Sequence, residues 1–178
     1  MKYKIIFFGV VLIILIVVTT VVSRETKPTL KNFSECIKAG YPVLESYPRR
    51  CTTNGEVFIE DIGNALEKQN LIVLFTPQPG TTIRSPLVIA GEARGNWFFE
   101  ASFPLILVDG EGREIASSFA TAQGEWMTTN FVPFTTTLIF SSPATSEGEL
   151  VLKKDNPSGL PEHDDELRIP VFFSTENP

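Results

Sequence analysis

Residues 98–122 read FFEASFPLILVDGEGREIASSFATA, two strand-like runs on either side of a glycine-containing turn. In the first run apolar side chains recur at every second position, as expected for a strand with one buried face: Phe99, Ala101, Phe103, Leu105 and Leu107. The turn DGEG at 109–112 is typical of a hairpin, because glycine adopts positive φ and Asp109 can accept hydrogen bonds from its own backbone. This stretch predicts two antiparallel strands, at 98–109 and 115–122.

The same pattern continues on both sides of this hairpin. With it, the strand-like runs separated by turn residues number seven: 71–76, 87–93, 98–109, 115–122, 134–140, 149–154 and 167–173. Seven short strands without intervening helices predict an all-β, antiparallel two-sheet sandwich over 71–174, with a short tail at 175–178. Pro104 and Pro170 are expected at edges or bulges, because proline lacks the N–H that a strand ladder uses.

The N-terminus carries an uncharged apolar run, IIFFGVVLIILIVVTTVV, at residues 5–22. As a helix it would span about 27 Å, close to the thickness of the hydrocarbon core of a membrane. Lys2 and Lys4 precede the run and favour an N-terminus held in the cytoplasm. We therefore expect residues 1–23 to be a signal anchor, a single-pass transmembrane helix that leaves the rest of the chain extracytoplasmic. The alternative is a signal peptide cleaved after Ser23, which would leave the chain secreted.

Three short segments separate this anchor from the predicted strands. A polar linker at 24–32 leads into a small module at 33–61, which contains both cysteines, Cys36 and Cys51. Exported chains meet an oxidising compartment, so we expect these two residues to form a disulfide bond. A connector at 62–70 contains NALEKQ and is expected to form a helical turn.

Turn residues of the strand region follow an order that resembles a known family. They are PQPG at 77–80, SPL at 85–87, GEA at 91–93, FE at 99–100, Asp109 with Gly112, PF at 133–134 and IPV at 169–171. On these residues, 71–173 is similar to the immunoglobulin-like domain of bacterial spore germination proteins, the second of the Gmad families. The resemblance implies an extracytoplasmic immunoglobulin-like sandwich with a binding or scaffolding role and no catalytic residues. It does not imply germination, because the domain also occurs in bacteria that do not sporulate.

The charge distribution narrows the class of partner. Two of the 15 basic side chains, Lys2 and Lys4, precede the apolar run, and all 21 acidic side chains follow it. Such an acidic ectodomain argues against nucleic acid and against an anionic lipid surface as the main partner. We expect a membrane-anchored binding or scaffolding protein that engages a protein or cell-envelope partner, with no small-molecule cofactor.

Three candidate binding residues, Trp126, Met127 and Phe131, fall in a predicted loop between strands. Loops at the ends of sandwiches often bind partners, and an exposed tryptophan is typical of a binding hot spot. For Trp126 the alternative is packing over the open end of the core.

Arg49 and Arg50 are two further candidates, inside the loop that the cysteines close. A basic pair in a braced, exposed loop is also found in protease inhibitors that present it to a trypsin-like enzyme, so inhibition by the cysteine loop is an alternative function. The alternative is that both are solvated or pair with nearby carboxylates: Glu35, Glu45 or Glu56.

Catalytic and metal-binding patterns are weak in this sequence. His163, the single histidine, stands in the polar loop EHDDE without a nucleophile motif beside it, and we expect it to be solvated. A weak calcium site is the alternative there, from Asp155, Asp164, Asp165 and Glu166. We expect no catalytic residues, no metal and no cofactor, so the chain is predicted not to be an enzyme; a role as an enzyme accessory module stays open.

Overall fold

The computed structural model describes residues 29–53 and 55–174. The predicted anchor at 1–23 and tail at 175–178 lie outside the described residues, as does most of the linker. Among the described residues no helix is long and apolar enough to cross a membrane. Their buried side chains form two separate clusters, a small one in the cysteine module and a large one in the strand region.

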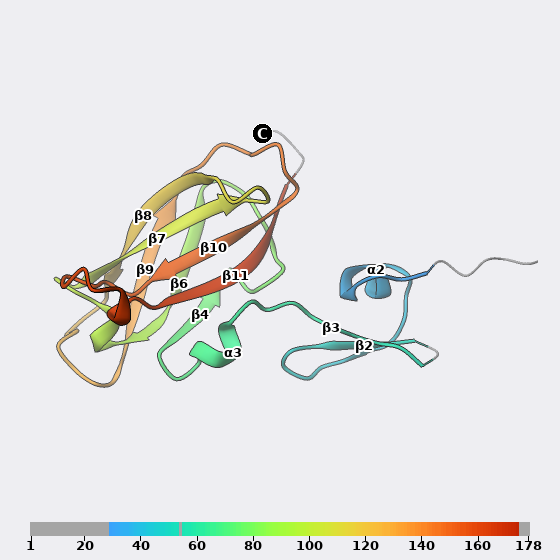
Figure 1. The fold of residues 1–178 in the computed structure, drawn as a ribbon, viewed down its shortest axis with the longest axis horizontal. Coiled ribbons are helices and arrows are strands. Elements are labelled where there is room, and N and C mark those ends of the chain that lie inside the picture. The colour runs from blue at the N-terminus through green and yellow to red at the C-terminus, as the bar shows by residue number, and fades with distance from the viewer. Residues whose placement is uncertain (1–28, 54, 175–178) are drawn as a thin grey trace, which may run out of the picture.

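The strand region forms a curled sheet of eight strands in the order β4-β6-β9-β8-β7-β10-β11-β5. The strands are β4 (Ile72–Thr76), β5 (Thr82–Ile83), β6 (Leu87–Arg94), β7 (Ser102–Asp109), β8 (Glu114–Ala122), β9 (Phe131–Leu138), β10 (Glu147–Lys153) and β11 (Glu166–Phe173). In Figure 1, β8, β7, β10 and β11 form the nearer layer, and β9, β6 and β4 lie behind them. The all-β prediction is confirmed, and each of the seven predicted runs contains a strand.

Two details differ from the predicted antiparallel two-sheet sandwich. First, the layers belong to one hydrogen-bonded sheet, because the last residues of β8 pair with β9 at Thr121–Thr135 and Ala122–Phe134. Second, β5 is an extra strand, and it pairs with β11 in parallel. A two-residue strand is too short to show a period, and hydrophobic alternation does not reveal which strands meet at the end of a layer.

The core fills the space between the layers. The Phe103 ring of β7 meets the Phe134 ring of β9 edge-on, with centroids 4.9 Å apart. Gly91 of β6 lies beneath Phe134: a Cβ at this glycine would stand 2.7 Å from the ring and 2.2 Å from the carbonyl oxygen of Val73. Glycine is therefore needed where β4, β6 and the aromatic ring converge.

The prediction that a strand begins at residue 98 was wrong by four residues. Phe99 and Ser102 bond each other's backbones across a tight turn, and Glu100 and Ala101 between them have positive φ of 49° and 61°. The turn removes Phe99 from the inner face, and its side chain is 41% exposed. Ser102 is the first residue of β7.

Both strand prolines avoid breaking a ladder. Pro104 lies in β7, an interior strand, but the pairing of β7 with β10 ends at Leu105, so no β10 partner needs its missing N–H. Pro170 pairs with Glu149 on one side, and on the other side β5 reaches only Phe172 and Phe173. Both prolines thus lie in interior strands rather than at the predicted edges or bulges: Pro170 lies where β11 extends beyond β5, and Pro104 lies just beyond the end of a ladder.

The cysteine module contains one helix and a three-stranded sheet. Its elements are α2 (Phe33–Lys38), β1 (Val43–Leu44), β2 (Arg50–Thr52) and β3 (Val57–Ile59), with β2 in the centre. The connector forms the predicted helical turn as α3 (Ala65–Lys68). Just before α3, Asn64 exchanges hydrogen bonds with the backbone of Arg168, which ties the connector to β11. Figure 1 shows the module extending from this tie, away from the curled sheet.

Candidate functional site

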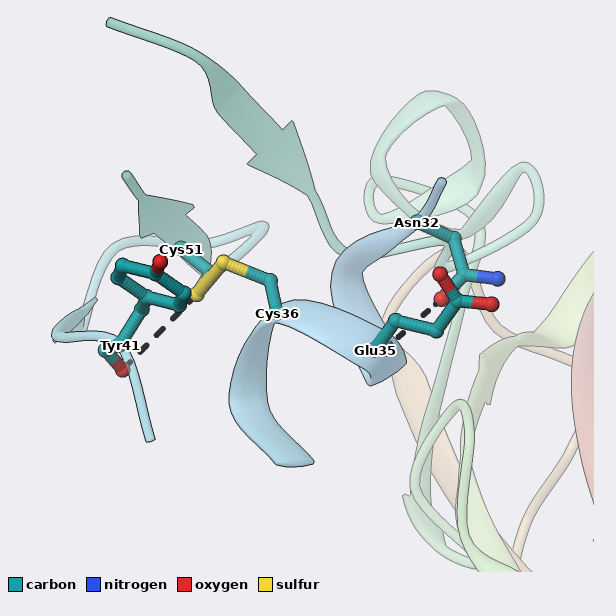
Figure 2. The surroundings of a disulfide bond; sticks show 5 residues. All are labelled: Asn32, Glu35, Cys36, Tyr41 and Cys51. Atoms are coloured by element: carbon teal, nitrogen blue, oxygen red, sulfur yellow. Dashed lines mark hydrogen bonds between the residues drawn. A yellow bond between two sulfur atoms is a disulfide. The ribbon is translucent and has the colours of Figure 1, made fainter. Parts of the chain in front are cut away.

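The cysteine module is organised around the predicted disulfide bond. Asn32 caps α2 by accepting the Glu35 N–H at 2.9 Å. This orients Cys36 toward β2, where Cys51 lies with a Cα–Cα separation of 6.1 Å, in the range of unstrained disulfides. Both cysteines are fully buried. Figure 2 shows the bond, with the Tyr41 carbonyl oxygen 3.9 Å from the Cys51 sulfur.

One face of the module's sheet is covered and the other is not. α2 and the disulfide cover the side that carries Val43, Cys51 and Phe58. Side chains alternate along a strand, so the opposite side carries the remaining strand residues: Leu44, Arg50, Thr52, Val57 and Ile59. We name these five residues the module face. Arg50 is exposed at its centre and makes no ion pair with the described residues.

Arg49, the neighbour of Arg50, is held by Glu60. The Glu60 carboxylate accepts the Arg49 backbone N–H, its Nε and a terminal nitrogen. These hydrogen bonds raise the pKa of Arg49, and they lower the pKa of Glu60 although partial burial opposes this. The Arg49 guanidinium also lies over the Phe33 ring, 5.4 Å from its centroid. The ion-pair partner of Arg49 differs from the three predicted carboxylates, because β2–β3 pairing brings Glu60 to this side chain; of the predicted three, Glu45 contributes only a longer-range attraction that also raises the pKa of Arg49.

A groove of about 710 Å³ separates the module from the outer surface of the curled sheet. We name it the inter-module groove. On the module side Phe33, Ile37 and Ile59 line it, and on the sheet side Val108 and Phe172 do so. Charged side chains also line it, among them Glu60 and Glu149, so the open groove offers a partner both apolar and charged contacts.

The β7–β8 hairpin forms one rim of this groove. Asp109 is buried there and accepts the backbone N–H groups of Glu111 and Arg113, while the Arg113 guanidinium bonds its second oxygen. Burial alone would raise the pKa of Asp109, but the hydrogen bonds from Arg113 and Glu111 hold it below its usual value. The carboxylate therefore fixes the turn, as the DGEG pattern predicted.

The three aromatic and sulfur candidates lie in different environments. Trp126 is half-buried and packs against the core, Met127 is 74% exposed, and Phe131 belongs to β9 rather than to the loop. Arg94 lies over the Phe131 ring at 4.1 Å and also bonds the Thr129 carbonyl oxygen. Of the three, Met127 is the side chain that this end of the sheet offers to a partner.

The loop that carries Met127 packs closely against Gly95. A Cβ at this position would stand 2.0 Å from the Thr128 carbonyl oxygen and 2.2 Å from that of Trp126. Its N–H donates to the Asn130 carbonyl oxygen. The loop that carries Met127 thus lies directly on the backbone of the β6–β7 connection.

The acidic loop before β11 is engaged in structural contacts. Asp164 accepts a hydrogen bond from Asn156, Asp165 pairs with Lys68 of α3, and Glu166 pairs with Arg168. His163 is exposed in a short helical turn. In the part of the chain that the structure describes, no group of three or more His, Cys, Asp or Glu side chains is placed to hold a metal ion.

Sequence reasoning missed the module face and the inter-module groove. Leu44, Val57 and Ile59 stand in strands of two or three residues, too short for a periodic signal. The signal that could have located the face is the position of Cys51: once it is paired with Cys36, its strand neighbours Arg50 and Thr52 must point the other way.

Comparison with known proteins agrees with this architecture. No curated protein matches the chain. The family model described as the immunoglobulin-like domain of bacterial spore germination matches residues 71–159, half of the chain. The match begins with β4 and includes β10, and β11 completes the sheet beyond it. The chain therefore belongs to the Gmad2 family, the immunoglobulin-like domain of bacterial spore germination.

Proposed function

We propose that this chain is a membrane-anchored, extracytoplasmic binding and scaffolding protein, with its N-terminus in the cytoplasm. The apolar run at 5–22, preceded by Lys2 and Lys4, supports the anchor and its orientation. A disulfide bond with both sulfurs buried supports export to an oxidising compartment. Release after cleavage behind Ser23 is the alternative location.

The observation that carries the binding role is the inter-module groove. It lies between the disulfide-closed module and the family's immunoglobulin-like sheet, and Ile37, 38% exposed, stands on its wall. A protein or cell-envelope partner that enters it would contact both modules at once. The connector from Asp61 to Asn64 then determines how far the two walls stand apart.

A capture experiment with the detergent-solubilised full chain tests this role. Envelope extract is passed over the native chain, over Ile37→Asp, and over Leu160→Asp, whose position is comparably exposed but lies away from the groove. The proposal expects a partner that the native chain and Leu160→Asp retain and Ile37→Asp loses. Equal retention by both variants would exclude the groove as the binding site.

A protease-inhibitor role for the cysteine loop has less support. Arg50 pairs with Leu44 on one side and Ile59 on the other, so its backbone is occupied in the centre of a sheet. A substrate-like inhibitor must offer its backbone to the protease as a free extended strand. We expect the full chain to leave the rate of a trypsin-like enzyme unchanged; inhibition that Arg50→Gln abolishes would restore the alternative.

A further inference from the structure

The module face has no cover within the described chain. Leu44 is 60% exposed, and Val57 and Ile59 are each 56% exposed. Cross-strand register places Leu44, Arg50 and Ile59 in one row and Val57 beside Thr52 in the next. Three aliphatic side chains therefore surround one guanidinium on a single small surface.

This composition matches a lipid–water boundary. Aliphatic side chains enter the region beneath the headgroups, while an arginine side chain reaches the phosphates with its charged end and keeps its stem in the apolar layer. The face carries no carboxylate, although the ectodomain as a whole is acidic. These five residues therefore add no carboxylate repulsion where the face would meet the lipid phosphates.

The length of the intervening chain brings this face to a membrane. The apolar run ends at Val22, and the described chain begins at Thr29. Seven residues reach at most about 25 Å when fully extended. With the run in a bilayer, Thr29 is held within that distance of its surface, and the cysteine module follows directly.

We propose that the module face rests on the outer surface of the membrane, with Leu44 and Val57 beneath the lipid headgroups and Arg50 on their phosphates, while Ile59, at the edge of the face, borders the inter-module groove. This proposal depends on the proposed anchoring by residues 5–22. The module then contacts the membrane surface, and the connector that leaves it at Asp61 sets the orientation of the curled sheet relative to the membrane.

The experiment places a tryptophan on the face of the full chain reconstituted in phosphatidylcholine vesicles. Leu44→Trp and Val57→Trp are compared with Val88→Trp, a control on β6 whose native side chain is 54% exposed. Both native tryptophans, Trp97 and Trp126, lie in the sheet region and give all variants a common background. The proposal expects blue-shifted emission and loss of emission in vesicles with brominated acyl chains for the two face variants, and neither effect for the control.

Flotation of the same vesicles tests the anchoring by residues 5–22 separately from the membrane contact of the module face. A chain that does not float with lipid disproves the anchoring itself. A chain that floats while Leu44→Trp and Val57→Trp are quenched no more than Val88→Trp is anchored, but the proposed membrane contact of the module face is wrong. In the doubly substituted chain Leu44→Trp/Arg50→Glu, part of the quenching should be lost, because a glutamate is repelled by the lipid phosphates. Unchanged quenching would show that Arg50 does not contribute to the membrane contact.

Discussion

Arg49 and Arg50 are adjacent in sequence but lie in opposite environments. Arg49 binds the half-buried Glu60, whereas Arg50 is exposed on the module face. The sequence indicated that both belong to a braced loop, but it did not indicate Glu60, because that partner is eleven residues away and depends on strand register. Strand alternation then separates the two side chains.

Replacing each arginine by glutamine should therefore give different results. Arg49→Gln is expected to lower the free energy of unfolding of the module by about 1 kcal/mol, the scale of a partly exposed, bidentate ion pair. Arg50→Gln should change it little. Hydrogen exchange of the β2 and β3 amides measures both values, and equal effects would contradict the assignment of Glu60.

Asp109 gives a prediction for pH dependence. Its pKa is lowered in the folded chain, so its contribution to stability is present above the unfolded value of about 3.9 and is lost as the pH falls through the lower folded value. Asp109→Asn should lower the melting temperature at neutral pH, and the difference from the native chain should shrink below pH about 4. Calorimetry across this range measures it; a difference that does not vary with pH would show that the charge is not responsible.

Among the elements, the predicted strands were located well because their alternation is long enough to read. The turn at Phe99–Ser102 was missed because it contains no glycine or proline, although Glu100 and Ala101 have positive φ. The short β5 and the pairing of β8 with β9 were missed because both depend on tertiary approach rather than on local pattern. The same limit applies to the candidate site, whose walls come from distant segments.

The close approach at Gly91 gives a test of the packing between β4, β6 and β9. Gly91→Ala is expected to lower the free energy of unfolding of the sheet by about 1–3 kcal/mol, because the new methyl group overlaps the Val73 carbonyl and the Phe134 ring. Val88→Ala on the outer face of the same strand serves as the control and should change it by about 0.5 kcal/mol or less. Denaturant titration compares the two; a neutral Gly91→Ala would mean that the strands can separate there.

The disulfide bond is expected to stabilise the cysteine module but not the curled sheet. Its sulfurs pack in the module cluster, which shares no residue with the core of the sheet. Cys36→Ser/Cys51→Ser should remove about 3 kcal/mol of stability from the module on the chain-entropy model and leave the melting of the sheet unchanged. Limited proteolysis with calorimetry detects this pattern, whereas joint unfolding of both parts would show that they form one cooperative unit.

At the scale of the whole molecule, a small module and a larger sheet are joined by a connector that Asn64 ties to β11. This tie fixes one end of the connector, and the inter-module groove opens beside it. The proposed anchor and the proposed membrane contact of the module face would together hold the immunoglobulin-like sheet at a fixed distance from the membrane. The inter-module groove would then open between the membrane-bound module and the sheet.

Protease treatment of intact bacterial cells that express the full chain tests whether the chain is anchored with its C-terminal part outside the cytoplasm. We predict that the untreated chain stays in the membrane pellet after an alkaline carbonate wash, with a mass that includes residues 1–23. External protease should then remove the cysteine module and the sheet while a cytoplasmic control protein survives. A chain that is protected until the cells are broken, or that is recovered in the medium beginning at Arg24, would contradict it.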